Sequence, residues 1–139
     1  MNTINFTIPG KPLAKGRPRF SVRGGFAKAY TPKETANYEN LIMVVASQHA
    51  PEELWTGAIK MEIKIYRALL KSFSKKKTAL ALAGELRPTS KPDLDNYAKI
   101  LADGLNEIIY KDDAQIIEII VEKFYGDPPR AEVTLTHLQ

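Results

Sequence analysis

The sequence contains no cysteine among its 139 residues. Disulfide bridges, cysteine nucleophiles and cysteine-based zinc or iron–sulfur centres are therefore excluded. Histidine is almost as scarce, because only His49 and His137 are present, and we interpret both as surface or packing residues. Any chemistry must come from carboxylates, amines, hydroxyls or these two imidazoles.

Long apolar runs are also missing. No stretch approaches the roughly 20 apolar residues of a membrane-spanning helix, and the first residues, MNTINFTIPG, lack the basic and apolar regions of a secretion signal. The length of 139 residues and the hydrophobic content of 44% are typical of one compact globular domain. We therefore expect a single domain over residues 1–139 that is cytoplasmic and not bound to a membrane.

Acidic residues are missing from the first 33 positions. This segment holds seven of the 20 Lys and Arg residues and none of the 16 Asp and Glu residues. Such a concentration of positive charge could bind a polyanion such as DNA, or could be a solvated basic arm without a specific partner. The candidate DNA-binding residues of this segment are Lys11, Lys15, Arg17, Arg19 and Arg23.

The hydrophobic pattern predicts seven main elements. Strands are expected at residues 3–8, 57–67, 115–125 and 131–137, and helices at 31–48, 74–84 and 95–109. The segment 9–30 suits a loop or a hairpin with its turn at Arg23-Gly24-Gly25. The order β-α-β-α-α-β-β indicates an α+β domain with a mixed, largely antiparallel sheet covered by helices.

Three lysines, Lys75 to Lys77, occupy the first turn of the predicted helix that Ser74 caps. The helix dipole does not favour cations there. These lysines, and Lys91 further along, are therefore candidates for DNA contacts, although a solvated lysine face is the commoner explanation of such a run.

The first acidic cluster lies in the segment KPDLDNYAK, residues 91–99. Asp93 and Asp95 are two residues apart in an extended segment and are expected to project from the same side. Lys99 is one helical turn beyond Asp95, so its amine can return to the same region. The alternative is that Asp95 only caps the helix and pairs with Lys99, while Asp93 is a turn residue.

The second acidic cluster, Asp112 and Asp113, lies between the last predicted helix and the strand that follows it. Successive extended residues face opposite sides, so only one of the two needs to point at the first cluster. A helix over residues 95–109 would be about 20 Å long, too long for the short connector to span back. Either the clusters lie at opposite ends of the helix and a symmetric dimer joins them, or a shorter or tilted helix lets them meet within one chain.

Three or four carboxylates without clustered His or Cys suit Mg²⁺ or Mn²⁺ better than zinc. Such an ion activates water for attack on a phosphodiester, and a nearby lysine stabilises the developing charge. Two other functions stay open. One is a non-catalytic module that binds a DNA junction or duplex. The other is a small metal-dependent nucleotide hydrolase, which does not explain the acid-free first 33 residues.

The segments Asp93-Leu94-Asp95-Asn96, Lys99 and Asp112-Asp113-Ala114-Gln115-Ile116 resemble those of the RusA-type Holliday junction resolvases of bacteria and their phages. The segments KGRPRF, YTPKET, FSKKK and RPTSKPDLDN resemble the phage-type branch, so the similarity covers most of the chain. By this resemblance, Asp93, Asp95 and Asp113 are expected to be catalytic metal ligands and Lys99 the catalytic lysine. The resemblance leaves the role of Asp112 open.

The same resemblance implies a homodimeric, Mg²⁺-dependent endonuclease that makes paired symmetric nicks across a four-way DNA junction. Two symmetric cuts fit two sites related by a two-fold axis. The best-known members are shorter before the DLDN motif and carry an arginine run where this chain has Thr89-Ser90-Lys91-Pro92. The insert, roughly residues 70–88, contains Lys75 to Lys77 and is a candidate to take over DNA contacts.

Overall fold

The computed structural model describes residues 2–15, 19–23, 26–30 and 32–138, with the side chains of residues 19–30 outside the description. The strands are β1 (Asn2–Pro9), β2 (Arg19–Arg23), β3 (Phe26–Tyr30), β4 (Ile59–Arg67), β5 (Ile116–Tyr125) and β6 (Arg130–His137). The helices are α1 (Lys33–Ser47), α2 (Lys75–Leu82), α3 (Leu94–Gly104) and the short 3₁₀ helix η1 (Asp113–Gln115). The predicted α+β class and element order are confirmed, and β2 and β3 form the hairpin that was one interpretation of the basic segment.

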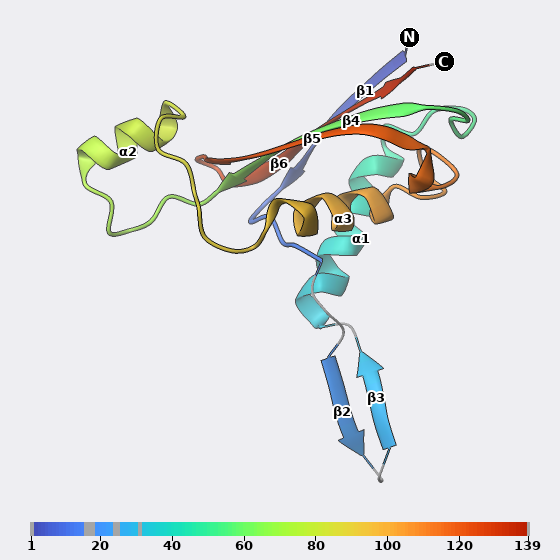
Figure 1. Cartoon of the computed structure of the whole chain (residues 1–139), viewed down its shortest axis with the longest axis horizontal. Coiled ribbons are helices and arrows are strands. Elements are labelled where there is room, and N and C mark those ends of the chain that lie inside the picture. The colour runs from blue at the N-terminus through green and yellow to red at the C-terminus, as the bar shows by residue number, and fades with distance from the viewer. Residues whose placement is uncertain (1, 16–18, 24–25, 31, 139) are drawn as a thin grey trace.

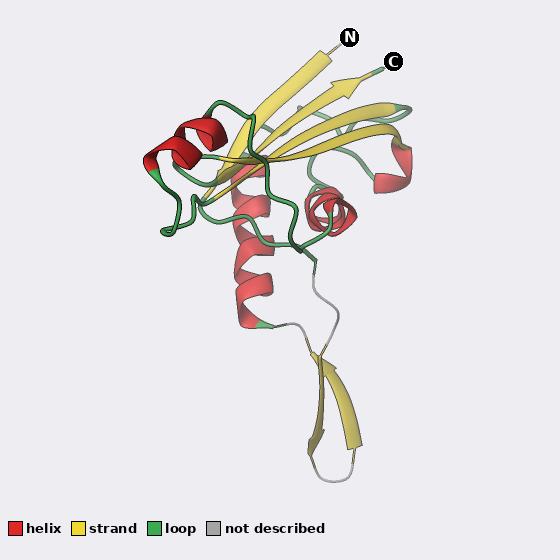
Figure 2. Ribbon diagram, turned by 60° about the vertical axis from the view of Figure 1, so that its left-hand side comes forward, coloured by secondary structure: helices red, strands yellow, loops and turns green. Residues whose placement is uncertain are grey.

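The main sheet has the strand order β1-β6-β4-β5. The pairs β1–β6 and β6–β4 are antiparallel, whereas β4 and β5 are parallel. The sheet is therefore mixed and largely antiparallel, as predicted, with β1 and β5 at its two edges. Helices α1 and α3 lie against one of its faces (Figure 1), and the turned view shows α3 end-on beneath the sheet beside α1 (Figure 2).

The core lies between this face of the sheet and the two helices. Alternation along β4 buries one side of the strand, which is the pattern expected of a strand with one covered face. The buried residues of the central strands are Ile59, Met61, Ile63 and Ile65 of β4 and Ala131, Val133 and Leu135 of β6. The helices contribute Tyr38, Ile42 and Ala46 from α1 and Tyr97, Ile100 and Leu101 from α3.

Helix α3 differs from the predicted helix over residues 95–109. Asp93, not Asp95, occupies the N-cap position, and its side chain makes no capping hydrogen bond. The helix ends at Gly104: the amides of Leu105 and Asn106 bond the carbonyls three residues back, and the Glu107 amide donates to the carbonyl oxygen of Tyr110 at 2.7 Å. Glu107, with φ of 64°, reverses the chain there.

The other predicted details mostly agree with the structure. Ser74 caps α2, since its Oγ accepts from the Lys77 amide at 3.1 Å. Thr31, the predicted cap of α1, lies outside the described residues. His137 stacks on Trp55 with ring centroids 4.9 Å apart, and His49 lies 5.7 Å from the Phe6 ring. Within residues 2–138 as described, no helix has both the length and the apolar content to cross a membrane.

Candidate functional site

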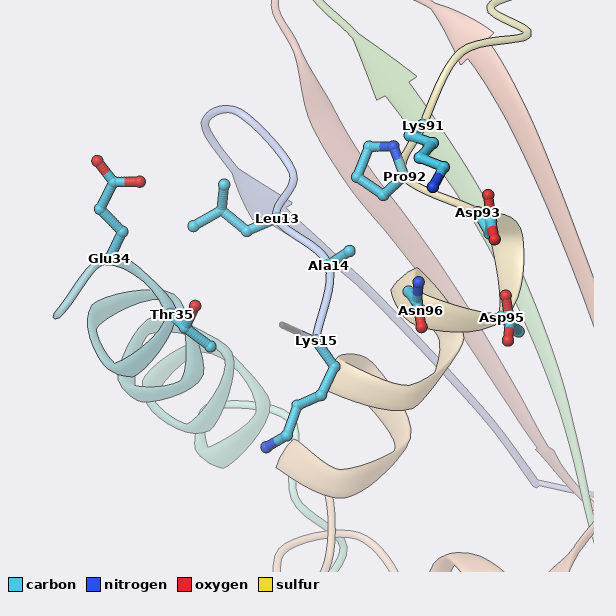
Figure 3. A pocket seen from close by; sticks show the side chains of 10 residues that line it. All are labelled: Leu13, Ala14, Lys15, Glu34, Thr35, Lys91, Pro92, Asp93, Asp95 and Asn96. Atoms are coloured by element: carbon cyan, nitrogen blue, oxygen red, sulfur yellow. The ribbon is translucent and has the colours of Figure 1, made fainter. Parts of the chain in front are cut away.

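The first turn of α3 opens onto a pocket of about 770 Å³. Asp93 and Asp95 line it on one side, and Glu34 from the first turn of α1 lines it on the other (Figure 3). Lys15 and Lys91 also border the pocket. Both aspartates are exposed, so their oxygens can reach a large substrate or an ion from solvent.

The loop that carries Asp93 is fixed by cations from two strands. Arg67 of β4 donates from Nη1 to the carbonyl oxygen of Ser90 at 3.0 Å and to its Oγ at 3.1 Å. Lys123 of β5 donates from Nζ to the carbonyl oxygens of Ser90 at 3.0 Å and Pro92 at 3.1 Å. The entrance to α3 is therefore tied to the carboxyl-terminal end of β5.

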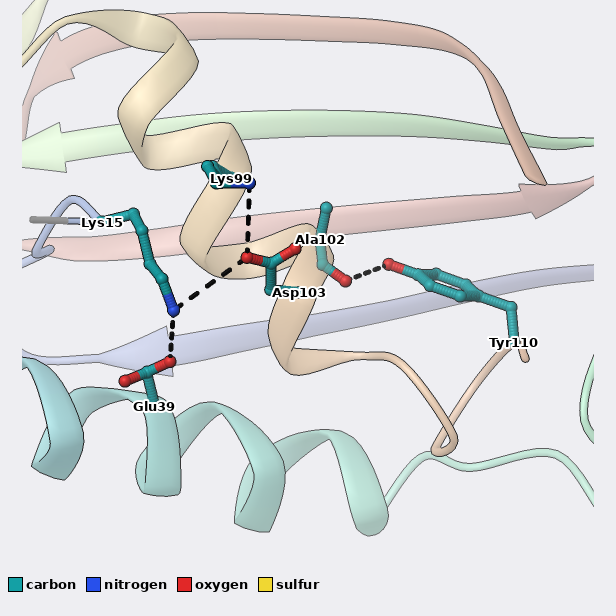
Figure 4. A network of polar contacts seen from close by, with 6 residues as sticks. All are labelled: Lys15, Glu39, Lys99, Ala102, Asp103 and Tyr110. Carbon is teal, nitrogen blue, oxygen red and sulfur yellow. Dashed lines mark hydrogen bonds and ion pairs between the residues drawn. The ribbon is translucent and has the colours of Figure 1, made fainter. Parts of the chain in front are cut away.

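Lys15 joins the basic segment to α3 (Figure 4). Its amide donates to the carbonyl oxygen of Asn96 at 3.0 Å, which lays residues 11–15 across the first turn of the helix. Its Nζ lies 2.7 Å from Oε2 of Glu39 and 4.0 Å from Oδ2 of Asp103. This candidate DNA-binding residue is thus already engaged by two carboxylates.

Lys99 does not return to Asp95, as the spacing had suggested. Its Nζ lies 3.8 Å from Oδ2 of Asp103, one turn further along α3, and its side chain is 63% exposed. Asp103 was not among the predicted site residues. Its contact with Lys99 could have been inferred, because residues 95, 99 and 103 lie at helical spacing on one face. Asp103 therefore holds the ammonium group of Lys99 towards the carboxyl-terminal end of α3 rather than towards Asp95.

Hydrogen bonds of the Gln115 side chain hold the second acidic cluster, Asp112 and Asp113, in place. Asp112 caps η1, since its Oδ1 accepts from the Ala114 amide at 3.1 Å. Gln115 accepts on Oε1 from the amide of Asp112 at 3.1 Å and donates from Nε2 to the carbonyl oxygen of Trp55 at 2.8 Å. These bonds use the carboxylate of Asp112 for capping and leave Asp113 as the better candidate ligand of the pair.

The two neighbouring carboxylates have opposite pKa shifts. A hydrogen bond shared with Asp112 raises the pKa of Asp113 above the usual aspartate range, and partial burial and the charges of Asp103 and Asp112 add to the rise. The Ala114 amide and the bond to Asp113 lower the pKa of Asp112. The charge of Asp103, in the last turn of α3, is thus one of the causes that raise the pKa of Asp113.

The two acidic clusters do not meet within one chain. The pocket wall includes Asp93 and Asp95 but not Asp113, and α3, with 11 residues, is about 16 Å long. In the described part of the chain, no group of three or more His, Asp or Glu residues lies close enough to hold a metal ion. The shorter helix is thus not enough to join the clusters, which lie towards opposite ends of α3.

The remaining candidate DNA-binding residues are dispersed. Lys11 and Lys91 are exposed at the edges of pockets beside the α3 entrance, and Lys75, Lys76 and Lys77 are exposed on α2, which lies well apart from α3 (Figure 1). Arg17 and the side chains of Arg19 and Arg23 lie outside the described residues. Of the predicted cations, Lys15 and Lys91 are thus the two that line the pocket of Asp93 and Asp95.

Comparisons with known proteins agree with the family resemblance of the two acidic segments. The family model "Endodeoxyribonuclease RusA" matches residues 9–136. The chain is also 47% identical over 137 residues to the uncharacterized protein YqaN of Bacillus subtilis (strain 168), covering 97% of this chain and 96% of that protein. The matched region includes both acidic clusters and almost all of the described fold. The chain therefore belongs to the RusA family of endodeoxyribonucleases.

Proposed function

We propose that the chain is a Mg²⁺-dependent endonuclease that resolves four-way DNA junctions by paired symmetric nicks. The observation that carries this proposal is the exposed pair Asp93 and Asp95 at the mouth of an open pocket, with Lys15 and Lys91 beside it. Carboxylates suit a hard cation, and lysines suit the phosphate backbone of DNA. Membership of an endodeoxyribonuclease family supports DNA as the substrate.

The donor set fits Mg²⁺, or Mn²⁺, because the candidate ligands Asp93, Asp95 and Asp113 offer only oxygen atoms. When bound there, such an ion would activate a water molecule and neutralise charge on the phosphate. Lys99 would stabilise the negative charge that develops on the phosphate. Because its side chain is 63% exposed, its amine can exchange Asp103 for a DNA phosphate without unfolding α3.

The separation of the acidic clusters favours a site that two copies build together. One chain presents Asp93 and Asp95 at one end of α3, while its Asp113 lies near Asp103 at the other end. In a symmetric dimer, Asp113 of the partner subunit can complete the site. Such a dimer contains two equivalent sites related by the two-fold axis, which fits two symmetric nicks.

The proposal is tested with a labelled four-way junction beside a linear duplex of matching sequence, each with Mg²⁺ and with EDTA. We expect Mg²⁺-dependent nicks in two opposing strands of the junction alone. Asp95→Asn should reduce the cleavage rate by at least about 100-fold, while Asp127→Asn, a change at an exposed aspartate in the turn before β6, should leave it unchanged. Cleavage by the Asp95→Asn variant at the wild-type rate would contradict the proposed mechanism.

Two contacts favour a second function, a junction-binding module without catalysis. Asp112 is used as a cap and Lys99 is paired with Asp103, as expected if these residues were structural. Tight junction binding without cuts in Mg²⁺ or Mn²⁺ would support that function. Release of phosphate or pyrophosphate from free nucleotides would instead support a nucleotide hydrolase.

A further inference from the structure

A second pocket lies beside the one that Asp93 and Asp95 line. Its volume is about 390 Å³, within the range of roughly 300–1,000 Å³ that is typical of small-molecule sites. It is lined by residues 11–14, by residues 67–70 at the end of β4, and by Lys91, Pro92 and Tyr97 at the entrance to α3. The carboxylates of the candidate site lie outside this second pocket.

The charged residues of the second pocket are all cationic. Among the described residues that line it, the charged ones are Lys11, Arg67 and Lys91, and none is acidic. The neighbouring pocket differs, since Asp93 and Asp95 place carboxylates in its wall. The second pocket therefore suits an anion directly, without a metal ion between the anion and the protein.

Arg67 is fixed in position but keeps donors for a ligand. Both of its hydrogen bonds to Ser90 come from Nη1, and a guanidinium also has N–H donors on Nε and Nη2. The planar array of arginine donors matches the oxygen atoms of a phosphate group. Since the bonds to Ser90 already orient Arg67, little side-chain entropy is lost when it binds a phosphate.

The rest of the lining is mostly apolar. Leu13, Leu69 and Leu70 contribute aliphatic surface, and Tyr97, which is 1% exposed, contributes a buried phenol. Burial raises the pKa of the Tyr97 phenol above its usual value, and the nearby charge of Arg67 opposes the rise. The hydroxyl therefore keeps its proton at neutral pH and is a hydrogen-bond donor.

We propose that this pocket binds one nucleotide unit, with its phosphate held by Lys11, Arg67 and Lys91 and its base and sugar against the apolar lining. A phosphate group alone leaves the leucines without a partner, and an apolar ligand leaves the cations without one. A nucleotide has both parts. The unit is either a free nucleotide or an unpaired nucleotide of a DNA strand.

The position of the pocket favours a nucleotide of a DNA strand, and this step rests on the proposed function. Residues 13–14 and 91–92 line both this pocket and the pocket of Asp93 and Asp95 (Figure 3). A strand with one phosphate at the carboxylates can therefore place a neighbouring nucleotide in the second pocket. Unpaired nucleotides leave the base stack at lower cost than paired ones, so such a pocket favours DNA with unpaired or distorted positions.

The first test measures nucleotide binding without any cleavage. In an NMR titration of the isotope-labelled protein in EDTA, thymidine 5′-monophosphate should bind at least about tenfold more tightly than inorganic phosphate or thymidine, because only the whole nucleotide contacts both kinds of lining. The shifted resonances should include those of residues 67–70. Equal affinity for the nucleotide and for inorganic phosphate, or no binding of the nucleotide, would overturn the proposal.

Exposed positions of the pocket allow variants that spare the core. Leu70 is 52% exposed, and Leu70→Asp should weaken nucleotide binding at least about fivefold, because its carboxylate repels the phosphate. Lys11→Gln should weaken binding by about three- to fivefold. Lys64→Gln is the matched control, since Lys64 is exposed on β4 between the buried Ile63 and Ile65 and so lies on the opposite face of the sheet. Wild-type affinity in both pocket variants would contradict the assignment.

A fluorescent base distinguishes the two sources of the nucleotide. The probe is a DNA duplex with one unpaired 2-aminopurine nucleotide, mixed with Asp95→Asn so that the strand stays uncut. If the pocket takes its nucleotide from DNA, the change in fluorescence should fall at least about threefold when Leu70→Asp is added. If the fluorescence does not depend on Leu70→Asp although the mononucleotide does, the pocket is a site for a free nucleotide.

The pocket and the proposed function can fail separately, because the titration in EDTA requires no catalysis. If the mononucleotide binds but the wild-type protein cuts no junction, the pocket stands and the nuclease proposal falls. If the wild-type protein makes paired nicks but the mononucleotide does not bind, the pocket assignment is wrong while the nuclease proposal stands.

Discussion

Asp112 and Asp113 are adjacent in the chain but have different surroundings. The amide of Ala114 bonds Asp112, whereas the neighbouring Asp112 carboxyl, partial burial and the charge of Asp103 raise the pKa of Asp113. Gln115 makes this division possible because it bonds the backbone of Asp112 and that of Trp55. The spacing indicated that only one of the two aspartates needs to point at the first cluster, but it could not show that hydrogen bonds of the Gln115 side chain set up the arrangement.

Tyr110 is predicted to stabilise the junction between α3 and the second acidic cluster. Its buried hydroxyl donates to the carbonyl oxygen of Ala102 at 2.6 Å, so Tyr110→Phe should lower the free energy of unfolding by about 1–2 kcal/mol. Tyr38→Phe is the matched control, because the buried Tyr38 hydroxyl has no hydrogen-bond partner among the described residues. That change should be neutral or stabilising in urea unfolding. Equal losses in both variants would contradict the assignment.

At the scale of elements, the sequence predicted every strand of the main sheet and all three α-helices, from hydrophobic patterns for most of them and from the Ser74 cap for α2. It missed the end of α3, since Ile108 and Ile109 continue the apolar pattern beyond Gly104. A local chain reversal follows that end, where Glu107 has a φ of 64° and its amide donates to the carbonyl oxygen of Tyr110 instead of back along the helix. The direction of Lys99 was missed for a related reason: a carboxylate lies one turn away on each side, and spacing does not choose between them.

The contact between α1 and α3 depends on Gly104. A Cβ at this position would lie 2.7 Å from Cγ2 of Ile42, a methyl group on a branched and buried side chain. Gly104→Ala should therefore destabilise the protein by about 1–3 kcal/mol, despite the better helix propensity of alanine. Thermal and urea unfolding would measure the loss. Adding Ile42→Leu, which lacks that methyl branch, should recover part of it; simple additivity of the two changes would argue against the clash.

At the scale of the whole molecule, the candidate site depends on distances that no local pattern contains. The sequence predicted the candidate carboxylates and the lysine, but it left open whether Asp93 and Asp95 would meet Asp113 within one chain or lie at the other end of a helix. It could not supply the loop anchored by Arg67 and Lys123. This anchoring arises from the parallel pairing of β4 with β5, which joins segments more than 50 residues apart.

A site shared between two copies makes a specific prediction for mixed inactive variants. In a heterodimer of Asp95→Asn with Asp113→Asn, one site contains both substitutions and the other contains neither. Random exchange of subunits at equal concentration makes about half of the dimers mixed, so the mixture should recover about a quarter of the wild-type nicks, mostly as single cuts. A mixture of Asp95→Asn with Asp93→Asn should recover nothing, since each site would then carry a substitution. If the first mixture stays as inactive as its components while subunit exchange is shown by mass, each site lies within one chain.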